Sequence, residues 1–399
     1  MDEIFELKNR KRLTLKRGKE RVAANRHPWI FAGAVGGESG PSDAAIADLV
    51  DANGVPLASG FYSSRSEIRL RALTFGDEQL TAELIGRRVE AAIERRRALL
   101  DAKTSAARLI NAEGDDLSGL VVDLYNDVVV AEVANAGLER VMPVVLDAIQ
   151  RLLKPRLIYL SNDLPARRLE EVSTEPRTIG EGSPATTIVE NGLRFEVDPA
   201  TGQKTGFFLD QRENRAIARS LASGRRVLNL FSYTGAFGVY AAAGGAAFVE
   251  NVEGSDVAIN QARRNHDLNG SANVAKFTVA DAFAHVRHLS GANERFGLIV
   301  CDPPAFAKRR VEVERAARGY KDINLYAMRL LEPNGSMLTF SCSGHMSLDL
   351  FQKVIFAAAL DAGRRISFVR RLTAGPDHPV SIYSPEGEYL KGFLLTALD

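Results

Sequence analysis

Residues 227–238 read VLNLFSYTGAFG, an apolar run that enters a turn containing two glycines. Four further apolar runs follow, at 248–252, 274–279, 298–301 and 337–340, with helical stretches beside them. Strands and helices that alternate over about two hundred residues are typical of a doubly wound, mostly parallel sheet. Ligands of such sheets bind beyond the carboxyl ends of the strands, so the residues at those ends are the first candidates for function.

The first three strand ends are suited to a nucleoside ligand. The turn after residue 230 contains glycine, which lets the backbone approach a ligand at a helix N-terminus, although its spacing is not Gly-x-Gly-x-x-Gly. Glu253 ends the second strand, 24 residues after Asn229, where nucleotide sites place an acid for ribose hydroxyls. An acid that is simply exposed to solvent at a strand end would explain Glu253 equally well. Asp281 ends the third strand beside Phe283, an aromatic suited to an adenine rim.

The fourth strand end is the most specific local signal, because it reads Cys301-Asp302-Pro303-Pro304-Ala305-Phe306. Two consecutive prolines hold the backbone extended and remove two amide donors. Few folds tolerate this at the end of a central strand unless its carbonyls or Asp302 face a ligand.

Ahead of this region the pattern predicts two smaller domains, over residues 1–75 and 76–187, with the alternating region at 188–399. The first has short strands separated by turns, and we expect Trp29 in its small-barrel core. The expected elements of the second are listed in chain order: a helix over 84–99, strands at 120–124 and 128–133, a helix over 141–153 and a strand at 157–160. Residues 165–184, which contain three prolines and two glycines, are the expected linker.

Composition limits the classes that remain. The chain has 399 residues, 45% hydrophobic and 25% charged, which predicts two or three folded domains and excludes disorder. No apolar run approaches the roughly 18–20 residues of a bilayer helix, and no signal pattern opens the chain. Two cysteines cannot form a disulfide framework or a four-ligand zinc site. We therefore expect a cytoplasmic protein with neither metal nor membrane partner.

Although the net charge of the chain is only +1, one segment near its N-terminus is strongly basic. Between Lys8 and Arg26 nine basic residues face a single acid, Glu20. Clustered cations are the footprint of a phosphate-backbone ligand, but they are also what a solvated arm carries. Interleaved apolar residues (Leu13, Leu15 and Val22) favour a folded strand with basic edges.

Together these features resemble the S-adenosylmethionine-dependent methyltransferases of nucleic acids, and more closely the ribosomal RNA large subunit methyltransferase I family. Members of that family form 5-methylcytidine in 23S ribosomal RNA. The stretches that carry the resemblance, over nearly the whole chain, are 111–115, 117–120, 201–212, 318–324 and 340–344. Two positions depart from the family pattern: Glu253 replaces a common Asp, and His345 stands where an apolar residue is expected.

The resemblance implies an α/β fold: a class I, Rossmann-like methyltransferase domain with an N-terminal PUA-like small β-barrel and a middle α+β domain. It implies S-adenosylmethionine as the cofactor, ribosomal RNA as the partner and a homodimer as one candidate assembly. The implied cofactor-binding residues are Asp210, Asn229, Phe231, Tyr233, Thr234, Gly235, Glu253, Ser255, Asp281 and Ala282. The implied substrate-binding residues are Pro303, Pro304, Phe306, Lys204, Arg318 and Lys321, although the three cations could equally bind phosphate or cap helices.

The implied reaction needs a thiol, because carbon 5 of cytosine is a poor nucleophile until a thiolate adds to carbon 6. In the family the cysteine of the Ser-Cys-Ser-Gly turn is the nucleophile, which is Cys342 here, and Asp302 holds the base. Cys301 precedes Asp302 by one residue, so strand alternation turns it to the opposite face and predicts a structural role. The general base stays open between a water and a hydroxyl such as Ser341.

Three other functions are weaker readings. An RNA guanine-N methyltransferase on the same fold needs no cysteine, so Cys342 disfavours it. A nicotinamide-dependent dehydrogenase needs the Gly-x-Gly-x-x-Gly turn that this chain lacks. A non-catalytic RNA-binding protein explains the basic segment but not Asp302 and its two prolines together with Cys342.

Overall fold

The computed structural model describes residues 2–202 and 204–399 and divides the chain into two compact units. Unit 1 comprises Met1–Ile188, Val197–Phe207 and Pro376–Gly387, and unit 2 comprises Val189–Glu196, Phe208–Gly375 and Glu388–Asp399. Most of the expected catalytic region is therefore unit 2, whereas two of its stretches, 197–207 and 376–387, fold with the N-terminal half. The three-domain division remains a prediction.

Unit 1 begins with a six-stranded sheet of order β2-β6-β5-β4-β1-β3. Its strands are β1 (Lys11–Leu15), β2 (Trp29–Phe31), β3 (Val35–Ser39), β4 (Ile46–Val50), β5 (Pro56–Tyr62) and β6 (Ile68–Phe75), with the short helix α1 (Arg21–Ala24). Leu13, Leu49 and Leu70 pack in its core. Two expectations are wrong here. Val22 lies in α1 instead of a strand, and Trp29 is half-buried, because its indole Nε1 donates to Glu113 at 2.8 Å.

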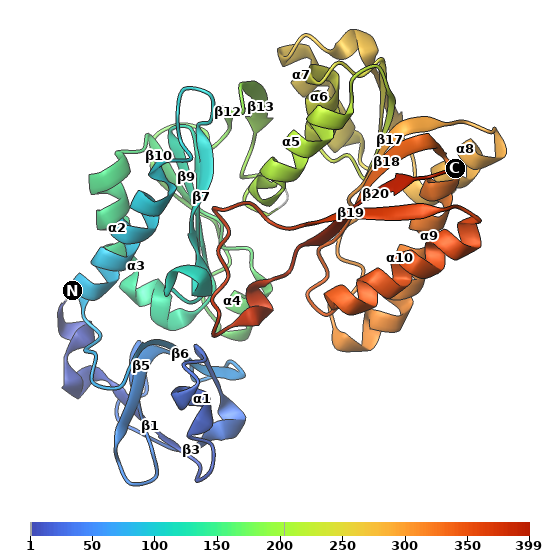
Figure 1. The fold of residues 1–399 in the computed structure, drawn as a ribbon. Coiled ribbons are helices and arrows are strands. Elements are labelled where there is room, and N and C mark those ends of the chain that lie inside the picture. The colour runs from blue at the N-terminus through green and yellow to red at the C-terminus, as the bar shows by residue number, and fades with distance from the viewer. Residues whose placement is uncertain (1, 203) are drawn as a thin grey trace. The chain divides into compact units, whose positions relative to one another are not determined.

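The second sheet of unit 1 has the order β11-β10-β9-β8-β7. Its elements are α2 (Ala82–Arg97), β7 (Ala106–Asn111), β8 (Leu120–Tyr125), β9 (Val128–Val133), α3 (Ala136–Leu153), β10 (Leu157–Leu160), α4 (Pro165–Leu169) and β11 (Arg177–Gly180). The expected helices and strands are confirmed. The linker prediction is partly wrong, because α4 and β11 lie inside 165–184 and β11 pairs with β10. α2 and α3 cover one face of the sheet (Figure 1).

The two sheets of unit 1 share a hydrophobic core. Phe5, Ala45 and Phe61 from the N-terminal part belong to the same buried cluster as Ile85 of α2 and Val129 of β9. Removing residues 1–75 would therefore expose apolar side chains of the second sheet, so a deletion cannot isolate the RNA-docking role expected for that segment.

Unit 2 contains a seven-stranded sheet of order β16-β15-β14-β17-β18-β20-β19. The strands are β14 (Arg226–Leu230), β15 (Phe248–Glu253), β16 (Ala275–Val279), β17 (Phe296–Cys301), β18 (Leu331–Ser341), β19 (Ile366–Leu372) and β20 (Lys391–Ala397). The five strands expected from apolar runs are confirmed and pair in parallel. β19 and β20, which were not expected, add an antiparallel edge. β12 (Thr186–Glu190) and β13 (Leu193–Val197) form a separate two-stranded sheet.

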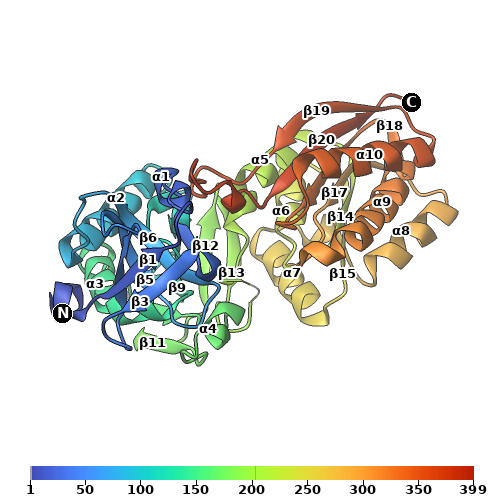
Figure 2. The same cartoon turned by 90° about the horizontal axis from the view of Figure 1, so that it is seen from below.

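Helices cover both faces of this sheet (Figures 1 and 2). The unit contains α5 (Arg212–Leu221), α6 (Ala236–Ala243), α7 (Asp256–Leu268), α8 (Ala282–Gly291), α9 (Val313–Arg329) and α10 (Leu348–Ala362). α8, α9 and α10 pack on one face with Leu228 and Ile299, whereas α5 and α6 pack on the other with Val227 and Val300. Alternate residues of one strand therefore serve opposite cores.

The 3-10 turns among the described residues are Asp2–Phe5, Leu7–Asn9, Ala32–Ala34, Ala112–Asp115, Leu209–Gln211, Ala272–Val274, Arg310–Glu312 and Pro385–Gly387. No helix in the part of the chain that the structure describes is long and apolar enough to cross a membrane.

Candidate active site

The turn after β14 has a strained backbone. Phe231 and Tyr233 have φ angles of 58° and 47°, which L residues rarely adopt, and Gly235 has a φ angle of 77°. A Cβ at Gly235 would lie 2.8 Å from the Cβ of Ala262 in α7, so only glycine fits. Strain of this kind costs about 1–3 kcal/mol per residue and is concentrated at ligand sites. The turn is at the end of β14, beside β17, where the strand order reverses and ligands of such sheets bind.

Glu253, at the end of β15, holds this turn. Its Oε2 accepts from the backbone N–H of Tyr233 at 3.0 Å, and its Oε1 accepts from Gly254 at 2.8 Å and Ser255 at 3.2 Å. Within the turn, Ser232 Oγ and Thr234 Oγ1 are buried and have no hydrogen-bond partner among the described residues. Buried hydroxyls without a partner are unfavourable, so this turn fits a polar ligand such as the nucleoside and amino-acid parts of S-adenosylmethionine.

Asn229 lies beneath the turn. Its side chain is 1% exposed and donates to Asn251 Oδ1 at 2.9 Å, and Asn251 in turn contacts His266 Nε2 at 3.2 Å. Burial lowers the pKa of His266 to about 4, so the imidazole is neutral. A Cβ at Gly238 would lie 2.2 Å from Asn251 Oδ1, which shows how tightly α6 packs here. Asn229 is therefore placed to support the turn, and direct cofactor contact by its side chain remains only a prediction.

The remaining cofactor candidates cap helices or line the adjoining surface. Ser255 Oγ accepts from Ala258 N at 3.3 Å at the start of α7, and Asp281 Oδ1 accepts from Ala284 N at 2.8 Å at the start of α8. Ala282 is buried. The Phe231 ring lies 6.2 Å from Phe283 and 6.4 Å from Phe306 between ring centroids. These three rings join the ends of β14, β16 and β17 in one apolar wall.

Asp302 follows β17 and is held by Gln211, which ends the 3-10 turn before α5. Gln211 Nε2 donates to its Oδ2 at 3.0 Å, and Asn214 Nδ2 donates to Gln211 Oε1 at 2.6 Å. Asp210 accepts a hydrogen bond from the Tyr389 hydroxyl, and its carbonyl accepts from Gly375 N at 3.1 Å. Asp210 thus ties the start of this segment to the C-terminal strands, and its expected role in cofactor binding stays untested.

Cys342 lies in the turn after β18. It is half-buried beside the core that contains Val300 and Phe340, and its Sγ lies 3.6 Å from the Pro303 carbonyl oxygen. The alternation that places Val300 on this face also places Asp302 there, one strand away. The structure therefore brings together the thiol, the acid and the two-proline segment that the sequence singled out.

Ser343 joins this turn to its neighbours. Its hydroxyl accepts from the Ala307 N–H at 3.1 Å and contacts the Tyr320 hydroxyl at 2.9 Å. Burial raises the pKa of Tyr320, so it stays a neutral phenol, and its ring lies 4.6 Å from that of Phe306. Cys342, Phe306 and α9 are thereby held as one assembly.

The expected substrate-binding residues lie in different surroundings. Pro303 is buried and Pro304 exposed, and Phe306 lines a hollow of about 410 Å³ with Lys308, Arg315 and Gly319. Among the cations, Arg318 is exposed on α9, Lys321 pairs with Asp361 of α10 at 2.6 Å, and Lys204 belongs to unit 1. Their roles in substrate binding remain predictions.

Sequence reasoning missed several residues that build the site, namely Gln211, Asn214, Tyr320, Ser343 and Lys391. Gln211, Tyr320 and Ser343 lie inside stretches that carry the family resemblance, which was the available signal. Lys391 offered none, because β20 was not expected.

The motif at 111–115, in unit 1, is structural. Asp115 is buried and accepts two hydrogen bonds from Arg96, at 2.7 and 2.6 Å. A Cβ at Gly114 would lie 2.0 Å from the Pro379 carbonyl oxygen, and Asn111 Nδ2 donates to the same oxygen at 2.9 Å. This motif attaches the segment 376–387 to the second sheet of unit 1.

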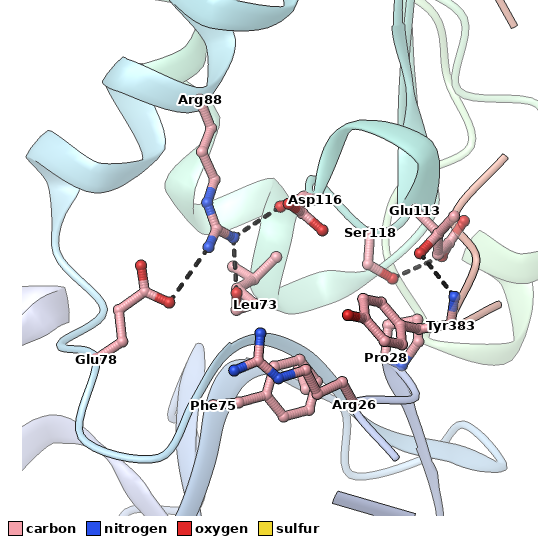
Figure 3. A pocket seen from close by; sticks show the side chains of 12 residues that line it. Arg26, Pro28, Leu73, Phe75, Glu78, Arg88, Glu113, Asp116, Ser118 and Tyr383 are labelled. Carbon is pink, nitrogen blue, oxygen red and sulfur yellow. Dashed lines mark hydrogen bonds and ion pairs between the residues drawn. The ribbon is translucent and has the colours of Figure 1, made fainter. Parts of the chain in front are cut away.

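Unit 1 also has a hollow of about 300 Å³ beside α1 (Figure 3). Arg88 on its wall donates to the carbonyls of Leu73 at 2.7 Å and Asp116 at 2.9 Å, and Glu113 accepts from Ser118 Oγ at 2.6 Å. Arg26 differs: it is exposed, has a φ angle of 54°, and its guanidinium makes no hydrogen bond or ion pair with a described residue. The basic segment is not uniform either, because Arg10 is buried and donates to Phe5 and Leu80 carbonyls.

Known proteins share this organisation. A family model described as S-adenosylmethionine-dependent methyltransferase matches residues 165–390, and one described as a PUA-like domain matches residues 13–75. The "Ribosomal RNA large subunit methyltransferase I" of Tolumonas auensis is 44% identical over 96% of this chain and 98% of its own length. The chain belongs to the ribosomal RNA large subunit methyltransferase I family. The protein of the same name from Shewanella denitrificans is 41% identical over the same shares of the two chains.

Solved structures agree on the fold of the family member described here. A methyltransferase complexed with SAH has a TM-score of 0.83 over 96% of this chain and 99% of its own. A chain from Streptococcus mutans, described as a SAM-dependent methyltransferase, has a TM-score of 0.81 over the same shares. Both are 21% identical and so show the fold alone. S-adenosylmethionine is the cofactor, as the family resemblance implied. The turn at 231–235 and Glu253 remain the predicted binding residues.

Proposed function

We propose that this protein methylates carbon 5 of a cytidine in ribosomal RNA, 23S by family resemblance, through a covalent adduct of Cys342. One observation carries the proposal: the Cys342 thiol lies at the Pro303 carbonyl, on the same face of the sheet as Asp302. Relatives named as ribosomal RNA large subunit methyltransferases over nearly full length support the substrate class.

The chemistry assigns separate tasks to these residues. The Cys342 thiolate adds to carbon 6, forming an S–C bond and moving the electron pair to carbon 5. Bound S-adenosylmethionine supplies the methyl group to carbon 5. Loss of the carbon-5 proton then restores the 5,6 double bond and expels the thiolate, so the enzyme ends unchanged.

Asp302 stabilises the base during these steps. A carboxyl group can accept from the cytosine amino group and share a proton with the ring nitrogen, which lowers the cost of charge on the ring. Gln211 fixes the carboxylate by its 3.0 Å hydrogen bond. Ser341, a candidate base, is fully buried and its Oγ lies 3.4 Å from the Ser343 N–H, so a water is the better supported acceptor of the carbon-5 proton.

We infer that unit 1 docks the RNA. Its residues 13–75 match a PUA-like domain, and Arg26, which lines the hollow in Figure 3, has a guanidinium that makes no hydrogen bond or ion pair with a described residue. Because such a contact releases counterions, Arg26→Glu should flatten the salt dependence of RNA binding without changing cofactor affinity. Unchanged salt dependence would remove Arg26 from the interface.

The adduct gives the decisive test. RNA that carries 5-fluorocytidine at the target position has no proton to lose at carbon 5, so the enzyme should remain attached to it after methyl transfer. We expect a band that survives denaturing electrophoresis with wild type and with Cys301→Ala, and none with Cys342→Ala. Methylation of guanine nitrogen, or cytosine methylation by Cys342→Ala, would contradict the proposal.

A further inference from the structure

The turn that carries Cys342 is held by one ammonium group. Lys391 begins β20 and lies opposite Ser341 in the antiparallel pairing with β18. Its Nζ donates to the Ser343 carbonyl at 2.8 Å and to the Met346 carbonyl at 2.7 Å. Both acceptor residues are fully buried. The Ser343 carbonyl also accepts from the Met346 N–H at 3.0 Å, so Lys391 is its second donor, and the ammonium ties together two carbonyls that lie one and four residues beyond Cys342.

The ammonium is buried and both of its partners are neutral. Lys391 is 5% exposed, and no carboxylate among the described residues lies within ion-pair distance of its Nζ. Carbonyl oxygens solvate a buried cation but do not neutralise it. If the purpose were only to hold the turn, a neutral donor would do so at lower cost. The charge itself therefore calls for an anion nearby.

The titratable groups around the turn identify that anion. Burial lowers the pKa of Lys391, while negative charge at Cys342, and to a lesser degree at Glu388, raises it. Glu388 is exposed and so is well screened by water. Tyr320, from α9, is a neutral phenol because burial raises its pKa. Asp302 is the other acid on this face of the sheet. Since the attraction between two groups is mutual, the ammonium favours the thiolate of Cys342.

We propose that Lys391 is a positioning residue that presents Cys342 and holds its sulfur as the thiolate. This role rests on the proposed cysteine adduct. It also explains how a thiol beside an acid can be ionised at neutral pH, which the adduct requires.

The thiolate can be measured without the reaction. In a Cys301→Ala background only Cys342 remains, so its alkylation by iodoacetamide against pH reports the ionisation midpoint. Lys391→Met should raise that midpoint by about one pH unit or more and slow alkylation at pH 7.5 about tenfold. Lys391→Arg, which keeps the charge, should stay closer to wild type. Lys353→Met, which removes an exposed lysine paired with Asp349 on α10, is the matched control and should change nothing.

Methyl transfer provides the second readout. Lys391→Met should lower kcat about tenfold with KM for RNA and Kd for S-adenosylmethionine within twofold, and the loss should shrink as pH rises. If Lys391→Met fails to bind the cofactor, Lys391→Gln, which keeps a donor and loses the charge, takes its place in both measurements. The proposal would be overturned if Lys391→Met, or Lys391→Gln in its place, had the same alkylation midpoint as wild type. A different outcome would separate the two proposals. If Lys391→Met raises the alkylation midpoint but Cys342→Ala still methylates fully, the effect of Lys391 on the thiol stands and the proposed adduct is refuted.

Discussion

The ends of β17 and β18 are neighbours in one parallel sheet and each carries a cysteine, yet the two thiols have opposite environments. Cys301 is fully buried among Leu228, Ile299 and the helices of one face, and burial with the nearby Asp302 charge raises its pKa far above that of a free thiol. Cys342 is half-buried beside the other face, next to the Pro303 carbonyl and in the turn whose Ser343 and Met346 carbonyls accept from Lys391. Two cysteines at equivalent strand ends therefore differ in burial and in their nearest polar groups, and the proposed nucleophile is the one that is less buried.

The largest expected effect is that of replacing Cys342, the more exposed of the two cysteines. Cys342→Ala should lower kcat for methyl transfer by roughly three orders of magnitude or more, because it removes a bond made only during the reaction. Calorimetry with S-adenosylmethionine and filter binding of RNA should stay within twofold of wild type. A variant that binds neither would show that Cys342 supports the fold, and the contrast with Cys301 would fail.

Asp302→Asn tests whether the acid next to Cys301 in sequence acts with Cys342 in space. The amide keeps the size and the contact with Gln211 but cannot take up charge or a proton, so kcat should fall about 100-fold with a smaller change in KM. Single-turnover methylation would measure the step directly. If this variant kept the wild-type kcat, Asp302 would not be the acid that acts with Cys342.

Glu253→Ala separates cofactor binding from the thiol chemistry. The substitution removes the acceptor for the Tyr233 and Gly254 N–H groups and for the expected ribose hydroxyls, so Kd for S-adenosylmethionine should rise about tenfold or more. At saturating cofactor the alkylation of Cys342 should be unchanged. Asp256→Ala, in the exposed first turn of α7, serves as the control. Unaltered affinity by calorimetry would remove Glu253 from the site.

The smallest expected effect is that of replacing Cys301, the buried cysteine. Cys301→Ala should keep methyl transfer within about twofold and cost about 1 kcal/mol of unfolding free energy, as for other small buried side chains. Because the folded thiol has a raised pKa, the unfolded chain releases that proton first as pH rises, so wild-type stability falls above about pH 9. The difference between variant and wild type should therefore narrow there, as urea unfolding at pH 7 and pH 10 would show. Strong loss of activity at pH 7 would mean that both thiols are needed.

Much of the fold was predictable from local pattern. The five parallel strands of unit 2 and the helices of unit 1 were predictable because apolar periodicity acts over a few residues. β19 was not, because most of its residues are exposed and it lacks an apolar run. β11 lies within the expected linker because it is exposed throughout and depends on pairing with β10, so its own residues carry no strand pattern.

The sequence by itself determined the α/β class, the strand ends that carry the chemistry and, through strand alternation, that Cys301 and Asp302 face opposite ways. Only the tertiary structure decided which side chains complete the site. Gln211 reaches Asp302 across 91 residues and Lys391 reaches the Cys342 turn across 48. Such contacts depend on the order in which strands assemble in the sheet, and no local periodicity records that order.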